Sequence, residues 1–134
     1  MTKAFIIIIL FCSCSEQKVV NTKRIYKDSL AAVIEKGQDS LVMREPVCIQ
    51  DMIRKFQADE KQNPPRSVFR YTYKERTVYY VPAICCDFFS DLYDDNCNLI
   101  AHPDGGFTGK GDGKADDFKD IRKDGLLIWK DERK

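Results

Sequence analysis

The chain has 134 residues, of which 43% are hydrophobic, and its formal net charge is +1. This length suits one domain, so it excludes a multidomain enzyme, a (β/α)₈ barrel and a coiled-coil rod. Acidic and basic residues nearly cancel, so the whole chain lacks the positive charge typical of nucleic-acid-binding proteins. Its six cysteines are many for this length and indicate a compartment in which disulfides form.

The first residues have the pattern of an export signal. Lys3 is followed by an apolar run from Ala4 to Phe11. A helix of that length measures about 12 Å, which is too short to cross a bilayer core of about 30 Å. We therefore expect a signal peptide over residues 1–13.

The residues after the apolar run are similar to the lipobox of bacterial lipoproteins, in which a small residue precedes a cysteine that is lipidated and becomes the mature N-terminus. Cys14 fits this pattern because Ser13 is small. Cys12 fits less well, because Phe11 would occupy the cleavage position. A plain secretory peptide cleaved nearby is the alternative. A lipid on Cys14 would anchor the protein, since each buried methylene contributes about 0.8 kcal/mol.

Residues 14–44 are predicted to be a lipidated N-terminus and a tether. Within them, Asp28–Lys36 has the pattern of a short helix ended by Gly37. Cleavage removes Lys3, one of the 22 basic residues, so the 21 acidic residues balance the remainder and the formal charge falls to zero.

The predicted domain covers residues 45–134 and begins with a helix. Pro46 suits a first helical turn, and Asn63-Pro64-Pro65 stops the helix. Between them the apolar residues fall on one stripe at helical spacing. That stripe consists of Cys48, Ile49, Met52, Ile53 and Phe56.

Two hairpins are expected next. In Ser67–Tyr73 aromatic residues fall at alternate positions, and Arg76–Ala83 is rich in β-branched and aromatic side chains, so both segments are predicted to be strands. Leu92–Tyr93 and Cys97–Ile100 flank Asp94-Asp95-Asn96, which is a typical turn sequence.

The chain is predicted to end in a helix and a strand. Asp116 can cap a helix that runs to Lys123, with Phe118 and Ile121 facing inward. Gly125 would end this helix, and Leu126–Trp129 would form the last strand. The predicted fold is therefore α+β: an N-terminal helix on a small antiparallel sheet of hairpins, a glycine-rich loop, a short helix and a final strand.

Four cysteines of the expected domain are predicted to form two disulfides, because an exported chain keeps few free thiols. They are Cys48, Cys85, Cys86 and Cys97. A bridge between the adjacent Cys85 and Cys86 would close a strained small ring, so Cys48 and Cys97 are each expected to pair with one of them. Which pairs with which stays open.

Five short motifs of the chain form a recognisable set: Val78–Pro82, Cys85–Asp87, Leu92–Asp94, Pro103–Gly106 and Gly109–Gly113. With this set the chain resembles a family of small domains of unknown function, found mainly in exported lipoproteins of Bacteroidota and related bacteria. The resemblance covers residues 45–131 and supplies no activity. Family members often carry cysteines where this chain has Ala101 and Ala115. The resemblance therefore implies the loss of one disulfide and a less tightly closed glycine loop.

The glycine-rich loop, residues 102–114, holds five of the seven glycines. Its spacing does not match the phosphate-binding loop, which needs four residues between its first glycine and Gly-Lys. Four nearby aspartates do not have the spacing of a calcium-binding EF-hand either: Asp104, Asp112, Asp116 and Asp117. We therefore predict no metal and no cofactor. The candidate binding residues of the loop are His102, Asp104, Phe107, Lys110 and Asp112.

These patterns predict a non-catalytic binding or interaction module, anchored by lipid at the cell envelope. The expected partners are the membrane, through the lipid, and an envelope protein or small ligand, without nucleic acid. One alternative is a small hydrolase or thiol enzyme that uses His102, the only histidine, with nearby acids or with Cys85 or Cys86. Another is an inhibitor-like domain that presents the loop to an enzyme. No catalytic residue is assigned.

Overall fold

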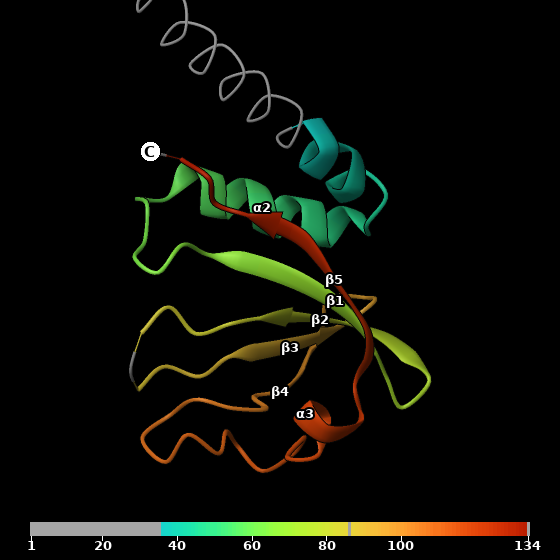
Figure 1. Ribbon diagram of the computed structural model, residues 1–134, viewed down its shortest axis with the longest axis vertical. Coiled ribbons are helices and arrows are strands. Elements are labelled where there is room, and N and C mark those ends of the chain that lie inside the picture. Colours follow the sequence, from blue (N-terminus) through green and yellow to red (C-terminus); the bar gives the residue numbers. More distant parts are fainter. Residues whose placement is uncertain (1–35, 86, 134) are drawn as a thin grey trace, which may run out of the picture. The chain divides into compact units, whose positions relative to one another are not determined.

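The computed structural model describes residues 36–85 and 87–133 (Figure 1). The predicted signal peptide, Cys14, most of the tether and Cys86 lie outside the described residues. None of the described helices is long and apolar enough to cross a membrane.

The described residues confirm the α+β class. Five antiparallel strands form one sheet with the order β4-β3-β2-β1-β5. The strands are β1 (Ser67–Tyr73), β2 (Arg76–Val81), β3 (Asp91–Asp94), β4 (Leu99–Ala101) and β5 (Lys123–Lys130). Two further elements are the helices α2 (Val47–Ala58) and α3 (Phe118–Ile121). Both predicted hairpins are present as β1–β2 and β3–β4.

The two faces of the sheet have separate cores, because successive side chains of a strand point to opposite faces. On the face that we call the helix face, α2 packs against β1, β2 and β5. Its core consists of Ile49, Ile53, Val68, Tyr79, Val81, Ile128 and Trp129. On the opposite face, which we call the loop face, the core consists of Tyr73, Val78, Leu92, Ala101, Ala115 and Phe118. Figure 1 shows α2 on one side and α3, with the preceding loop, on the other.

Helix α2 begins after Pro46, as predicted, but ends at Ala58, before the predicted stop at Asn63. The last carbonyl groups of a helix need donors from outside it. Here the guanidinium of Arg133 donates to the carbonyl oxygens of Phe56, Gln57 and Asp59 at 2.8–3.1 Å. Arg133 therefore satisfies the carbonyl groups at the end of α2, a contact that sequence spacing could not indicate.

The fold reaches further toward the N-terminus than residue 45. Residues 36–42 are helical, so Gly37 does not end a helix as predicted. The backbone N–H of Lys130 donates to the side-chain oxygen of Gln38 at 3.1 Å, and Val42 packs against the helix-face core. A compact unit accordingly begins at Lys36.

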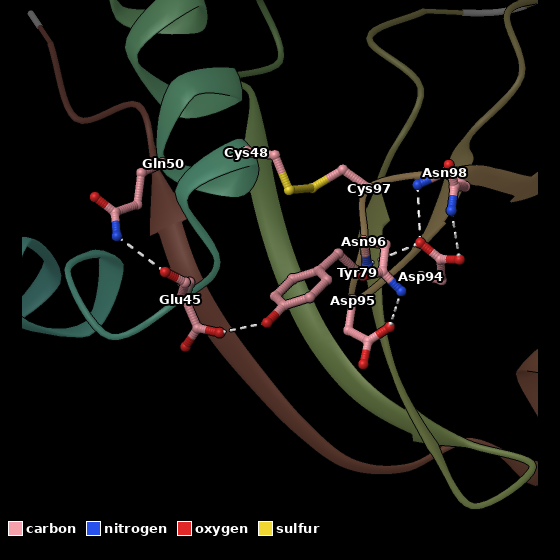
Figure 2. The surroundings of a disulfide bond; sticks show 9 residues. All are labelled: Glu45, Cys48, Gln50, Tyr79, Asp94, Asp95, Asn96, Cys97 and Asn98. Carbon is pink, nitrogen blue, oxygen red and sulfur yellow. Dashed lines mark hydrogen bonds between the residues drawn. A yellow bond between two sulfur atoms is a disulfide. The ribbon is translucent and has the colours of Figure 1, made fainter.

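Glu45 lies two residues before the start of α2 and is buried. Its carboxylate accepts hydrogen bonds from the Tyr79 hydroxyl at 2.6 Å and from Arg70 at 2.7 Å. Its carbonyl oxygen accepts a third from Gln50 (Figure 2). A buried carboxylate requires such partners. Burial and the Glu45 carboxylate together raise the pKa of Tyr79.

The disulfide pairing differs from the prediction. Cys48 of α2 bonds to Cys97 of the β3–β4 turn, with their Cα atoms 6.2 Å apart (Figure 2). Cys97 has a positive φ of 60° in this turn. Cys85 is also disulfide-bonded. Because Cys48 and Cys97 bond to each other, the prediction that each pairs with Cys85 or Cys86 is wrong.

The C-terminal helix is shorter than predicted. It spans only Phe118–Ile121, and β5 already begins at Lys123. Phe118 is buried as expected, but Ile121 is 40% exposed and does not face inward. Gly125 lies inside β5 rather than ending a helix, at a place where a Cβ would be 2.5 Å from the Tyr71 ring.

The predicted cap of this helix is also wrong. Asp117, not Asp116, precedes the first helical residue, and its side chain makes no capping hydrogen bond. The Asp117 carboxylate instead accepts from the Tyr73 hydroxyl at 2.5 Å and pairs with Lys74 at 2.9 Å. Those bonds hold the pKa of Asp117 below its usual value.

Candidate binding loop

Asp104 fixes the base of the glycine-rich loop. Its side chain is buried, and its carboxylate accepts hydrogen bonds from the Ser90 hydroxyl at 2.5 Å and the Tyr80 hydroxyl at 2.9 Å. The Lys119 ammonium lies 3.4 Å from the same carboxylate. The Ser90 hydroxyl also accepts from the backbone N–H of Ala83. Buried polar groups bonded in this way rigidify their surroundings.

The same network affects the titration of Tyr80. Burial of the phenol, together with the adjacent Asp104 carboxylate, raises the pKa of Tyr80 to about 12. The phenol therefore keeps its proton, and its hydrogen bond to Asp104, at neutral pH.

Backbone hydrogen bonds close the loop on itself. Asp112 N–H donates to the His102 carbonyl at 2.9 Å, Gly111 N–H to the Gly105 carbonyl at 3.1 Å, and Gly106 N–H to the Phe88 carbonyl at 3.0 Å. Gly111 has a φ of +69°, and a Cβ there would lie 1.9 Å from the His102 carbonyl oxygen. Only glycine fits this crossing of the chain.

His102 lies beside β3 and faces an acid. Its Nδ1 atom is 2.9 Å from a carboxylate oxygen of Asp91 and 3.2 Å from the Ser90 carbonyl. Because both neighbours are acceptors, Nδ1 carries the proton and Nε2 keeps its lone pair in the neutral ring. The ring packs against Phe89 at 5.0 Å between centroids.

The five predicted loop residues divide into two groups. Asp104, His102 and Asp112 hold the loop in place; Asp112 accepts from the Lys114 N–H at 3.1 Å. Phe107 and Lys110, in contrast, are exposed, and Phe107 is 94% exposed.

Two further aromatic side chains add to the exposed surface beside the loop. Phe88 is 63% exposed and Phe89 is 46% exposed. Phe89 also bridges to Gly105 through the backbone, so these side chains adjoin the loop. Exposed aromatic side chains gathered on one surface are typical of surfaces that bind other molecules.

Sequence reasoning missed the partners that hold the loop. Tyr80 falls within the predicted strand Arg76–Ala83 and is given no further role by the sequence, and neither Ser90 nor Asp91 stands out in it. Nothing in their spacing indicates a contact with Asp104 or His102. The adjacent Phe88 and Phe89, in a connection where apolar residues are unusual, were the one available signal. No group of three or more His, Cys, Asp or Glu side chains in the described ranges is arranged to hold a metal ion.

The two alanines at the ends of the loop are both buried. Ala101 and Ala115 are each 3% exposed and belong to the loop-face core with Phe118. The loop therefore closes over small apolar side chains at the positions where the resemblance places cysteines.

The fold and the loop define a small disulfide-bonded α+β domain with an exposed aromatic loop on one face. Its residues 54–131 match a domain of unknown function, DUF6970, and the chain belongs to this family. Comparisons with curated proteins and with solved structures find no match.

Proposed function

We propose that this chain is a lipid-anchored protein of the cell envelope, and that its glycine-rich loop is a non-catalytic surface for binding a protein partner. We further propose that it is one of the exported lipoproteins of Bacteroidota. The loop would insert Phe107 into an apolar pocket of the partner, and Lys110 would meet an acidic rim.

The observation that carries the binding role is the contrast between an exposed tip and a fixed base. Phe107 is 94% exposed, while Asp104, a few residues away, is buried and bonded to two hydroxyls. A flexible loop would lose conformational entropy on binding. A loop that is already ordered avoids most of that cost.

The envelope location is supported by two features. The Cys48–Cys97 disulfide is of a kind that persists in oxidising compartments outside the cytosol. The residues before Cys14 have the order of a lipoprotein signal: Lys3, an apolar run and then Ser13. Loss of radioactive palmitate labelling in a Cys14→Ala variant would support the anchor, and unchanged labelling would contradict it.

The binding role is tested by photo-crosslinking in intact cells that produce the full chain. A photoreactive phenylalanine analogue replaces Phe107, and in a matched control it replaces Val47, which is 67% exposed on α2. We expect a discrete adduct only from position 107, weakened by an added Lys110→Glu change. No adduct, or the same adducts from both positions, would contradict the proposal.

A second candidate function rests on the contact between Asp91 and His102. A carboxylate that holds Nδ1 leaves Nε2 available as a general base. Among the described residues, however, no hydrogen bond connects His102 to a hydroxyl or thiol that could act as nucleophile; the Ser90 hydroxyl binds Asp104 instead. This candidate requires a substrate hydrolysed by the native protein and not by a His102→Ala variant.

A further inference from the structure

A surface cavity of about 440 Å³ lies where the β1–β2 turn meets the junction of α3 and β5. This volume is within the range of small-molecule sites. Three cationic and two acidic side chains contribute to its wall. The lining residues are Thr72, Lys74, Glu75, Asp120, Ile121, Arg122 and Lys123.

Arg122, like Arg44 and Arg76, forms no ion pair with a carboxylate among the described residues, and of these three only Arg122 lines the cavity. Arg54, Arg66, Arg70 and Arg133 each pair with a carboxylate. In the described part of the chain, no carboxylate pairs with Arg122. Its guanidinium instead packs over the rings of Tyr71 and Phe118, at 4.7 Å and 5.2 Å from their centroids.

Contact with the two rings restricts the guanidinium, and among the described residues no carboxylate accepts from its N–H donors. Those donors lie in the plane of the guanidinium, in a fork that matches the two oxygens of a carboxylate or phosphate. A guanidinium that is held in place also loses little rotamer freedom when it binds. Arg122 is therefore preorganised for an oxyanion.

The two lysines of the cavity are less available to a ligand than Arg122, because each lies near a carboxylate. Lys74 lies 2.9 Å from a carboxylate oxygen of Asp117, which offsets its charge. Lys123 is 3.9 Å from Glu75 in an exposed pair, which contributes little to stability and opens at small cost. Ile121, 40% exposed, supplies an apolar wall.

We propose that this cavity binds a small molecule through a carboxylate or phosphate group, with Arg122 as the principal contact and Lys123 as a supporting cation. The apolar part of the ligand would lie against Ile121. The site uses none of residues 102–114, so it is independent of the proposed binding loop, and either proposal can fail alone.

NMR titration of the full chain tests this proposal. Inorganic phosphate and acetate are added separately at constant ionic strength, and the backbone amides of residues 72–75 and 120–123 are followed. We expect saturable shifts with at least one anion: saturation by phosphate alone assigns the site to phosphate groups, and saturation by acetate alone to carboxylates. An Arg122→Gln variant should bind at least about tenfold more weakly, the loss of one charged hydrogen-bonding group.

Two controls separate binding from structure. Arg54→Gln makes the same change on an exposed face of α2 and should leave the affinity unchanged. Arg122→Lys keeps the charge without the two-donor fork, so its affinity should fall between those of the native and Arg122→Gln proteins. Non-saturable shifts with both anions, or equal affinities for Arg122→Gln and Arg54→Gln, would overturn the proposal.

Discussion

The helix face of the sheet is covered by a regular helix that a disulfide and the C-terminal Arg133 hold in place. The loop face is covered mainly by chain with little regular structure, held by a buried Asp104 network and by glycines at crossing points. The first arrangement depends on a covalent bond between distant elements. The second depends on many short contacts, and it leaves aromatic side chains outside. The loop face therefore combines a fixed backbone with exposed aromatic side chains, which the helix face does not do.

The largest effect is expected on the helix face. A Cys48→Ala/Cys97→Ala variant loses a link across a sequence separation of 49 residues. In the chain-entropy account, this link contributes about 4 kcal/mol to the free energy of unfolding. Urea denaturation of the two proteins measures the difference. A loss below about 1 kcal/mol would mean that packing, not the disulfide, holds α2.

On the loop face, the strongest effect is expected at Gly111. A Gly111→Ala variant places a Cβ against the His102 carbonyl and also requires a positive φ, so we expect a loss of about 3 kcal/mol. Gly109→Ala is the matched control, because its φ is +70° and nothing lies within 4 Å. It should cost only about 1 kcal/mol. Equal losses in thermal unfolding would show that the crossing does not constrain the loop.

A smaller effect is expected at Tyr80. A Tyr80→Phe variant removes a donor to the buried Asp104 carboxylate and should lower the free energy of unfolding by about 1–2 kcal/mol. Tyr71→Phe removes a hydroxyl for which no side-chain hydrogen bond is found within the described ranges, and should change it by less than about 0.5 kcal/mol. Similar losses in the free energy of unfolding for the two variants would show that the Tyr80 hydroxyl does not stabilise the Asp104 network.

The smallest effect is on pH dependence. The pKa of Tyr80 is raised to about 12 in the folded protein, above its unfolded value of about 10. The contribution of the protonated Tyr80 phenol to the free energy of unfolding is therefore fully present below pH 10 and is lost as the pH rises toward 12. Denaturation between pH 9 and 11 should show a steeper decline for the native protein than for Tyr80→Phe. If the free energy of unfolding declines in parallel for the two proteins, the raised pKa of Tyr80 is contradicted.

Local patterns predicted most of the fold because the elements concerned have clear periodicity. The apolar stripe from Cys48 to Phe56 and the alternation in Ser67–Tyr73 gave the correct elements. The prediction of the disulfide pairing was wrong because the pairing depends on which elements meet in space. The predicted length of the last helix was wrong because Gly125, which was expected to end it, also suits a strand that passes close to the Tyr71 ring.

The candidate site was predictable only in its exposed half. Phe107 and Lys110 lie in a polar, glycine-rich stretch, where an exposed position is the ordinary expectation. Asp104 could not be recognised as the base of the loop, because its partners Ser90 and Tyr80 are 14 and 24 residues away. Buried polar networks of this kind are built by tertiary contacts and leave no local spacing.

Hydrogen exchange of backbone amides tests most directly the claim that the loop face is as fixed as the helix face. We expect the amides of Ser90, Gly106, Gly111 and Asp112, which donate to backbone carbonyls, to be protected by factors comparable to those of Ile53 in α2. Phe107, in the same loop, should exchange freely. Exchange of Gly111 and Asp112 at the rate of an unfolded chain, with Ile53 still protected, would contradict the account of a preformed binding loop.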